Sequence, residues 1–490
     1  MALRVGPATE GVDAVAYVAG KKEGLDWLRE KAGRAARLVV ELGDFRGEAE
    51  ETALVYREEV PHRVILAGAG GDEWYGDAER LRVGVAAAVR AARRIKNVKT
   101  LGVAVDPRLV EAAAGAGGGE PWAWEQALVA ADMANYVYSL RSKTEKPHVL
   151  DEIVVEAPGE EPLRTARAIA EAVRIARDIA NAPPERMNPE RLEEKAREIA
   201  RSYGLDITVL HRGELESLGM GGILGVGKGS DVEPRLIILR YSGGPRRVAV
   251  VGKAVTFDSG GLDLKPPQYM LEMKFDKSGG AAAIGAVVAA AALRLPFEVV
   301  ALVPAVENLP SGRSYKPLDV LDMYNGLTVE VGNTDAEGRL ILADALAYAA
   351  EKYKPELMID MATLTGAAVV ALGNHAAALM GNNEDLLKAV EEAAWRAGEP
   401  AWRLPMWPVY AKQLESKTAD TSNVGGRWAG AITAAKFLEK FVGDTPWAHL
   451  DIAGVAWVQE NGPKKPYYEH GATGWGVRTF VELLRARARA

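Results

Sequence analysis

The chain has 490 residues, of which 48 % are hydrophobic and 26 % charged, a composition typical of a globular protein with two or three domains. Its net charge of −7 leaves no basic excess, so we expect neither nucleic acid nor an acidic membrane surface as a partner. The absence of cysteine excludes disulfides, thiol nucleophiles and cysteine zinc sites. Because there are also only six histidines, acid–base or metal chemistry must use mainly Asp, Glu, Lys and Arg.

The N-terminal part alternates strand-like and helix-like segments. Strands are predicted at Arg37–Leu42, Arg63–Gly68 and Thr100–Val105, and a helix over Ala78–Ile95. Such alternation predicts an α/β domain. Residues 157–162 are polar and contain two prolines, which is typical of a linker. We therefore predict a smaller N-terminal α/β domain over residues 1–158 and a larger domain over residues 163–490.

The larger domain is predicted to be a three-layer α/β/α structure with a mainly parallel or mixed sheet. Helices are expected over Leu163–Ala180 and Pro189–Tyr203. Strands are expected at Arg235–Tyr241, Arg247–Val251, Val299–Val303, Leu327–Val331 and Leu357–Asp360. Two of these strands are apolar on both faces, which indicates a sheet covered by helices on both sides.

Neither a signal peptide nor a transmembrane helix is predicted. Arg4, Glu10 and Asp13 interrupt the first twenty residues, so no continuous apolar core of a signal peptide can be drawn. The longest apolar run, Gly279–Leu293, is shorter than the ~20 residues that span a bilayer. We interpret it as a buried helix and expect a cytoplasmic protein.

Several familiar catalytic motifs are absent. No serine has glycines two residues before and after it, as a nucleophile elbow requires, and no HExxH occurs. The run Gly222–Ser230 resembles a phosphate-binding P-loop, but Gly229 separates Lys228 from the hydroxyl residue. We interpret this run as a glycine-rich connection.

Carboxylates gather in three separate segments near the ends of predicted strands. Asp258 follows the strand at 247–251, Asp276 precedes the apolar helix, and Asp335 and Glu337 follow the strand at 327–331. If the backbone there is extended, Asp335, Glu337 and Arg339 face one way and converge. Four packed carboxylates repel one another unless cations neutralise them. The spacing alone leaves two interpretations open, a dinuclear metal site and ordinary solvated turns; Asp344, inside the following helix, we expect to be structural.

A resemblance to a known family separates these interpretations. The segments NTDAEGRL (333–340) and VGKAVTFDSGGLDLKP (251–266) resemble signatures of the leucyl, or cytosol, aminopeptidase family. The resemblance runs in order from about residue 165 to residue 490 and includes NAPPERMNP, GMGGILGVGKGS, ATLTGA and WAHLDIAGVAW. The N-terminal domain resembles the family only in its α/β pattern and position.

The resemblance implies two divalent metal ions per subunit, Mn²⁺ or Zn²⁺ first and Co²⁺ or Mg²⁺ as further options. Asp258 and Glu337 would bridge the ions, Asp335 would complete the readily exchanged site, and Lys253 with Asp276 the tighter one. As a metal ligand, the Lys253 amine must be neutral.

The remaining roles also follow from the resemblance. Lys265 and Arg339 match the family's two catalytic positions that are not metal ligands; Lys265 would stabilise the developing charge and Arg339 would hold a bicarbonate acting as general base. The positions that match the substrate-binding residues are Met273, Thr363, Leu364 and Gly366. The expected substrates are peptides with a free N-terminal amine and a leucine-like first residue, and the expected assembly is a homohexamer.

Two alternatives stay open at this stage. One is a two-metal hydrolase of a non-peptide substrate, such as a phosphoesterase, and the other is a non-catalytic scaffold member of the family. Lys277 and Ser278 differ from the Met and Cys that relatives often carry there, which bears on metal preference and pH optimum. No histidine is assigned a role, and His449 is expected to be structural.

Overall fold

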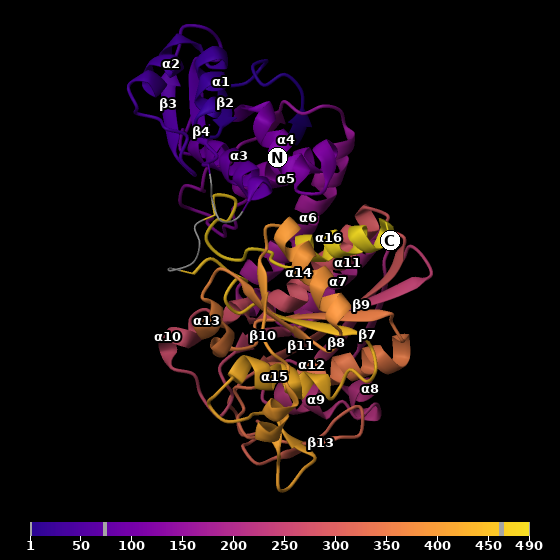
Figure 1. Cartoon of the computed structure of the whole chain (residues 1–490). Coiled ribbons are helices and arrows are strands. Elements are labelled where there is room, and N and C mark those ends of the chain that lie inside the picture. The colour runs from indigo at the N-terminus through magenta and orange to yellow at the C-terminus, as the bar shows by residue number, and fades with distance from the viewer. Residues whose placement is uncertain (1, 72–75, 460–464, 490) are drawn as a thin grey trace. The chain divides into compact units, whose positions relative to one another are not determined.

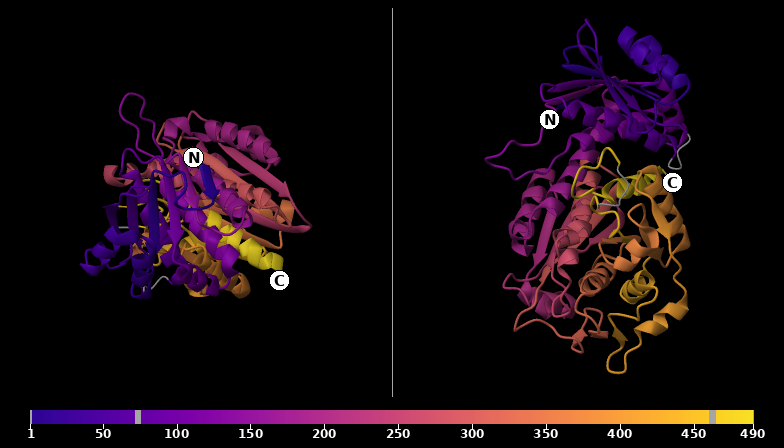
Figure 2. Two further views of the ribbon diagram at one scale, coloured as in Figure 1. Left: turned by 90° about the horizontal axis from the view of Figure 1, so that it is seen from above. Right: turned by 90° about the vertical axis from the view of Figure 1, so that its left-hand side faces the viewer.

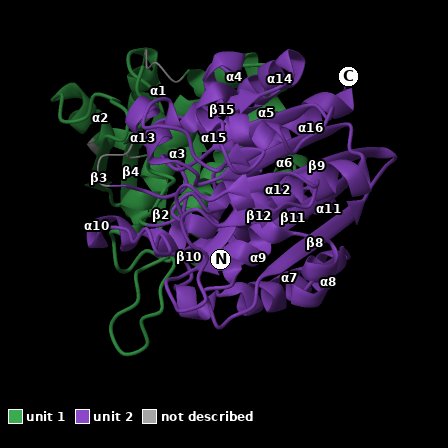
Figure 3. Ribbon diagram, turned by 90° about the horizontal axis from the view of Figure 1, so that it is seen from below, with its two compact units in different colours: residues 1–171, 464–470 green, residues 172–463, 471–490 purple. Residues whose placement is uncertain are grey.

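The computed structural model describes residues 2–71, 76–459 and 465–489. The chain forms two compact units, residues 1–171 with 464–470 and residues 172–463 with 471–490 (Figure 3). Helix α6 (Glu161–Asn181) carries the chain from the first unit into the second. Of the linker predicted at 157–162, residues 157–160 precede this helix and residues 161 and 162 form its start. The domain limits at 158 and 163 stay a prediction.

The first unit is built on a six-stranded sheet. Its strand order is β1 (Ala2–Val5), β6 (Glu152–Val155), β5 (Thr100–Val105), β2 (Ala14–Ala19), β4 (Arg63–Gly68) and β3 (Thr52–Tyr56). All neighbouring pairs are parallel except β3 with β4. The helices of this unit are α1 (Glu23–Lys31), α2 (Gly33–Glu41), α3 (Asp77–Arg93), α4 (Pro107–Gly115) and α5 (Gly119–Asn135) (Figure 1).

The strand predicted at 37–42 is wrong, because most of this segment lies in helix α2. Ala36 and Val40 are buried while Leu38 is 54 % exposed, so the buried side chains repeat every four residues, as on one face of a helix. A short apolar run does not distinguish a strand from a helix, and the preceding Ala32 belongs to the same buried face.

The second unit contains a nine-stranded mixed sheet. Its strands run in the order β16 (Ala401–Arg403), β15 (Ala377–Gly381), β18 (Trp447–Asp451), β14 (Leu357–Ala362), β9 (Arg246–Gly252), β11 (Phe297–Asn308), β8 (Arg235–Ser242) and β7 (Asp206–Leu210), with β10 (Ala254–Asp258) pairing with the end of β11. The central strands β18, β14, β9, β10 and β11 are mutually parallel, whereas β7, β8 and β15 add antiparallel pairs.

Helices cover both faces of this sheet. One layer consists of α7 (Pro189–Tyr203), α11 (Ser278–Ala292), α14 (Glu384–Arg396) and α16 (Val477–Arg489), the last coloured yellow in Figures 1 and 2. The opposite layer consists of α9 (Gly221–Gly227), α12 (Gly338–Tyr348) and α15 (Gly430–Glu439). This arrangement confirms the predicted three-layer α/β/α architecture. The buried helix expected at 279–293 is α11, and among the described residues no helix is long and apolar enough to cross a membrane.

Shorter elements complete the second unit. They are α8 (Arg212–Ser217), α10 (Pro267–Met270), α13 (Gly366–Leu372), the short helical turns η1 (Pro184–Arg186), η2 (Met273–Lys277), η3 (Ala349–Tyr353) and η4 (Pro408–Leu414), and the strands β12 (Val320–Asp322), β13 (Thr328–Glu330) and β17 (Thr421–Ser422). The strand predicted at 327–331 is β13, which belongs to a separate three-stranded sheet with β12 and β17. The carboxyl ends of the parallel central strands meet at one edge, where ligands of open α/β sheets bind.

Candidate active site

Three carboxylates converge at the carboxyl edge of the large sheet. Asp258 is the last residue of β10, and Asp335 and Glu337 lie in the loop between β13 and α12. One oxygen atom from each lies within 4.8 Å of the others, although Asp258 is 77 residues or more from its partners in the chain. The structure thus brings together three of the four carboxylates singled out in the sequence.

Lys253 joins the fourth carboxylate to this group. It lies between β9 and β10 and is only 3 % exposed. Its Nζ atom is 2.8 Å from Asp276 Oδ1 and 2.9 Å from Glu337 Oε1, and it donates a hydrogen bond of 2.9 Å to the Thr363 carbonyl. Asp276 is placed by η2, the turn that leads directly into α11.

Lys265 closes the other side of the cluster. Its Nζ atom is 2.8 Å from Asp258 Oδ2 and forms a second ion pair with Asp335. Each lysine therefore bridges two carboxylates. Among these six side chains, four acids face two ammonium groups, so two negative charges are left uncompensated when all are ionised.

The crowding of acids changes their proton affinity. Burial, together with repulsion from Glu337 and Asp258, raises the pKa of Asp335 to about 7. Burial and the Glu337 charge raise the pKa of Asp258, and burial raises that of Asp276 well above its ordinary value. Burial also acts on Glu337, but the charges of Lys253 and Lys265 outweigh it and hold the pKa of Glu337 below its ordinary value. Asp258, Asp276 and Asp335 therefore bind protons more tightly than free carboxyl groups do. Divalent cations bound among these side chains would neutralise the same negative charge.

This donor set fits divalent cations. The Oδ2 atom of Asp276 is buried without a hydrogen-bond partner, which costs free energy unless a donor or a cation reaches it. Carboxylate oxygens with one amine nitrogen suit Mn²⁺, Zn²⁺, Co²⁺ or Mg²⁺. Burial alone would lower the pKa of Lys253, but Asp276 and Glu337 raise it above its ordinary value. Lys253 is therefore an ammonium group until added positive charge displaces its proton.

A cavity of about 450 Å³ opens onto the cluster. It is lined by the five expected metal ligands and Lys265, and by all four expected substrate-binding residues, Met273, Thr363, Leu364 and Gly366. Tyr269, Val369, Val370 and Trp457 add apolar surface that the sequence reasoning did not identify. Trp457 stacks on Phe275, with ring centroids 5.4 Å apart, and donates a hydrogen bond of 2.9 Å to Glu272.

The extended backbone that would make Asp335, Glu337 and Arg339 face one way is wrong. The backbone after β13 forms a turn, with the Asp335 amide donating to Asn333 Oδ1, and Arg339 is the second residue of helix α12. Asp335 and Glu337 still converge, but from a turn and a helix start rather than from an extended strand. Arg339 is not among the described residues that line the cavity. Its Nη1 atom donates to the Asn423 carbonyl, its buried Nε atom has no hydrogen-bond partner, and burial lowers its pKa to about 10.

A buried asparagine that the sequence reasoning missed supports the carboxylates. Asn308 ends β11, and its Nδ2 atom donates to Asp258 Oδ1 at 2.9 Å and to the Thr334 carbonyl at 3.0 Å. On the opposite side, Thr363 Oγ1 donates to Asp276 Oδ1 at 2.8 Å. Neither residue carries a charge, so no pattern of acids and bases in the sequence could point to its supporting role.

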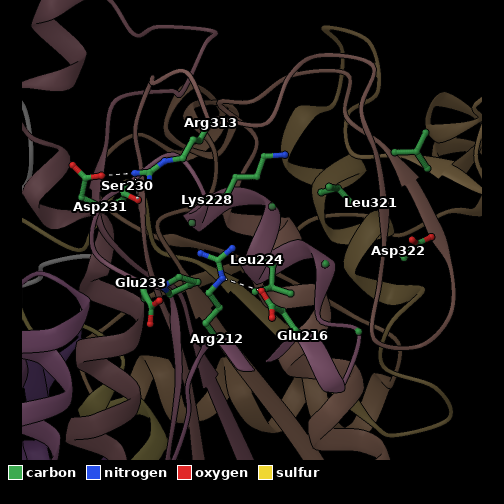
Figure 4. A pocket seen from close by; sticks show the side chains of 16 residues that line it. Arg212, Glu216, Leu224, Lys228, Ser230, Asp231, Glu233, Arg313, Leu321 and Asp322 are labelled. Carbon is green, nitrogen blue, oxygen red and sulfur yellow. Dashed lines mark hydrogen bonds and ion pairs between the residues drawn. The ribbon is translucent and has the colours of Figure 1, made fainter. Parts of the chain in front are cut away.

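The segment that resembles a P-loop lines a different pocket, of about 620 Å³ (Figure 4). Residues Gly221–Gly227 form helix α9 instead of a phosphate-cradling loop, and Ser230 Oγ donates to Glu307 at 2.6 Å. Two of the cations around this pocket are paired with acids, Arg212 with Glu216 and Arg313 with Asp231. These contacts support the interpretation as a glycine-rich connection.

Two further residues take structural positions. His449 is fully buried in the large sheet, where its Nδ1 atom lies 2.6 Å from Asp360 Oδ1. Asp344 is buried in α12 and accepts hydrogen bonds from the backbone amides of Ile223 and Tyr324. Among the described residues that line the cavity at the carboxylate cluster there is no histidine.

Comparisons with known proteins show which family this chain resembles over most of its length. The models described as the cytosol aminopeptidase family catalytic domain and N-terminal domain match residues 174–481 and 16–146. Relatives named probable cytosol aminopeptidase are 43 % identical in Roseiflexus castenholzii, over 94 % of each chain, and 43 % identical in Cenarchaeum symbiosum, over 87 % of this chain and 86 % of that one.

A solved structure of the bottromycin maturation enzyme BotP is 34 % identical, with a TM-score of 0.85, and covers 98 % of this chain and 100 % of that one. A second structure, of BotP in complex with Mn, is 33 % identical with the same TM-score and coverage. The matching models together span most of both units. The chain therefore belongs to the cytosol aminopeptidase family.

Proposed function

We propose that this metal-dependent peptidase releases N-terminal amino acids, with leucine and other apolar residues preferred, by means of two divalent cations. The observation that carries the proposal is the convergence of four carboxylates and two lysines on one side of an apolar cavity. Bound there, two cations would lower the pKa of a water held between them and polarise the scissile carbonyl. Mn²⁺ or Zn²⁺ is the expected occupant, with Co²⁺ or Mg²⁺ as further options.

We assign each residue of the cluster a role from its position. Asp258 and Glu337 would hold both cations, Asp335 would complete one site, and Lys253 with Asp276 the other. Positive charge held between Asp276 and Glu337 would repel the Lys253 proton, so that its amine could serve as a ligand. Lys265, which lines the cavity, would face the developing negative charge of the substrate carbonyl.

Arg339 is proposed to hold a bicarbonate ion that acts as general base. The N–H group of its buried Nε atom has no hydrogen-bond acceptor, and an oxyanion such as bicarbonate could accept a hydrogen bond from it. The N-terminal amine of the substrate is proposed to lie toward Lys253 and Asp276. The side chain of the substrate's first residue is proposed to lie toward Met273 and Leu364. An apolar wall of this kind favours leucine-like side chains, and a free amine requirement confines cleavage to the first peptide bond.

The two alternatives are less well supported. A phosphoesterase would need several basic side chains to bind the phosphate of its substrate. Among the described residues that line the cavity, the only basic ones are Lys253 and Lys265. A scaffold protein would be free to lose ligands, yet Lys253, Asp258, Asp276, Asp335 and Glu337 are all present and in contact range.

Hydrolysis of leucine p-nitroanilide tests the proposal. The enzyme should lose activity on chelation and regain it with Mn²⁺ or Zn²⁺, and N-acetyl-leucine p-nitroanilide should not be hydrolysed. Activity that chelation leaves unchanged, or equal rates on the acetylated substrate, would contradict the proposal. Light scattering tests the proposed homohexamer, for which a monomer is the contrary result, and fractionation of the source cells tests the proposed cytoplasmic location.

A further inference from the structure

The first unit has a cavity of its own at the carboxyl edge of its parallel strands. After β2 the chain passes through α1, α2 and β3 to β4, on one side of β2 (Figure 1). After β5 it passes through α4 and α5 to β6, on the other side. Ligands of open α/β sheets bind where the strand order reverses in this way. A pocket of about 820 Å³ lies here, within the size range of small-molecule sites.

Aromatic side chains form part of its wall. Tyr17 comes from β2, Trp27 from α1 and Trp124 from α5. Tyr17 and Trp27 meet edge to face with ring centroids 5.9 Å apart, which holds the Trp27 indole in place. The electron-rich faces of such rings attract cations, and Trp does so most strongly.

The charged residues of the wall are mostly acidic. Glu111, Glu120 and Glu156 face a single lysine, Lys31. Within the part of the chain that the structure describes, Glu111 and Glu156 have no ion-pair partner, whereas Lys31 already pairs with the neighbouring Glu30 at 3.7 Å. Glu156 directly follows β6 and Glu111 lies in α4, so acids approach the pocket from two separate elements. A phosphate or carboxylate ligand would be repelled here, and a cation attracted.

We propose that this pocket binds an organic cation with an apolar body, of the class of protonated arylalkyl or alkyl amines. The charge would lie near Glu156 and Glu111, and the apolar body against Trp27 and Trp124. Nothing in this pocket belongs to the metal site, so the inference does not depend on the proposed peptidase mechanism.

Calorimetric titration of the full-length enzyme with phenethylammonium chloride tests the charge preference. The matched probes are 2-phenylethanol, which lacks the charge, and 3-phenylpropionate, which reverses it. We expect phenethylammonium to bind at least about fivefold more tightly than either at low ionic strength. Equal or tighter binding of the neutral or the anionic probe would overturn the proposal.

Variants then locate the bound cation. Trp27→Ala and Glu156→Gln should each weaken phenethylammonium binding by about fivefold or more, whereas Glu58→Gln, an exposed acid elsewhere in the same unit, should not. Glu156 is exposed, so its replacement tests the site even if Trp27→Ala impairs folding. Hydrolysis of leucine p-nitroanilide should be unchanged in Glu156→Gln. Wild-type affinity in Glu156→Gln and in folded Trp27→Ala would place the probe elsewhere, for example at the metal site, and refute the assignment.

Discussion

Asn308 holds Asp258 in place with a hydrogen bond of 2.9 Å from Nδ2 to Oδ1 while the same nitrogen donates to the Thr334 carbonyl. An amide nitrogen has two hydrogens, so both bonds can form at once. Thr334 precedes Asp335, and Asn308 is fully buried at the end of β11. One uncharged side chain therefore fixes the distance between the carboxylate that ends β10 and the loop that carries Asp335 and Glu337.

Replacing Asn308 by Ala should loosen the proposed metal site without unfolding the protein. Residues that orient metal ligands typically contribute 10- to 100-fold in affinity or activity, so we expect a fall of about that size in kcat/KM or in metal affinity. The measurements are steady-state hydrolysis of leucine p-nitroanilide and metal content after dialysis. Asn382→Ala is the matched control, because Asn382 also donates to a carbonyl, that of Thr445, but is exposed. A fully active Asn308→Ala enzyme with normal metal content would show that Asp258 needs no such support.

Glu337 and Lys265 should separate metal binding from catalysis. Glu337→Ala removes a carboxylate that contacts Lys253 and lies next to Asp258 and Asp335, so we expect activity and metal stoichiometry to fall together. Lys265→Ala should keep both metals but lower kcat by about 10²- to 10³-fold, the usual cost of losing a group that stabilises developing charge. Metal analysis by mass spectrometry alongside kinetics checks both. Full activity in either variant would contradict the role assigned to that residue.

The sequence predicted the architecture well where the hydrophobic pattern was long and regular. Strands β4 and β5 and helix α7 have the predicted bounds, and α11 is shifted by one residue. For the short segment 37–42 the sequence predicts the wrong class of element, because six residues are too few to show a period. The structure places this segment in a helix that buries Ala36 and Val40 on one face.

The side chains proposed as metal ligands could be singled out in the sequence because they are charged and lie in distinctive segments. Their supporting contacts could not be predicted. Asn308 is not singled out in the sequence, and Thr363 is expected only as a substrate-binding residue, because both are uncharged and become partners of Asp258 and Asp276 only through tertiary contacts. Asp335 and Glu337 converge, but the extended backbone from which the sequence predicts this is absent, because the backbone there turns. The alternation of side chains along the sequence cannot reveal a turn that depends on tertiary contacts.

The proposed side-chain preference can be changed at Gly366. This glycine begins α13 and lines the cavity, and a Cβ atom added to it meets no atom within 4 Å. Gly366→Val should therefore fold normally but narrow the cavity. Because a methylene group in an apolar pocket is worth about 10-fold or more in discrimination, the ratio of kcat/KM for leucine over alanine p-nitroanilide should fall by at least about tenfold. Gly213→Val, at an open position in the first turn of α8, is the control. An unchanged ratio would place the substrate side chain elsewhere.

Glu79 should make the first unit sensitive to acid. Burial would raise its pKa, but Lys465 at 2.9 Å and Arg82 at 2.9 Å outweigh burial and hold the pKa at about 2, against 4.5 for a free glutamate. A lowered pKa in the folded state contributes stability above pH 4.5 that is lost as the pH falls toward 2. The shift corresponds to roughly 3 kcal/mol at neutral pH.

Glu79→Gln should consequently lower the thermal unfolding midpoint at pH 7, and the difference from the wild type should shrink steadily as the pH falls below 4.5. Scanning calorimetry of both proteins from pH 7 to about pH 3 measures this convergence. Glu41→Gln, at an exposed position of the same unit, is the control for the substitution itself. If the unfolding midpoint of Glu79→Gln stayed below that of the wild type by the same amount at every pH, the prediction would be contradicted. The lost stability would then come from packing, because ion pairs of Glu79 would disappear as it becomes protonated.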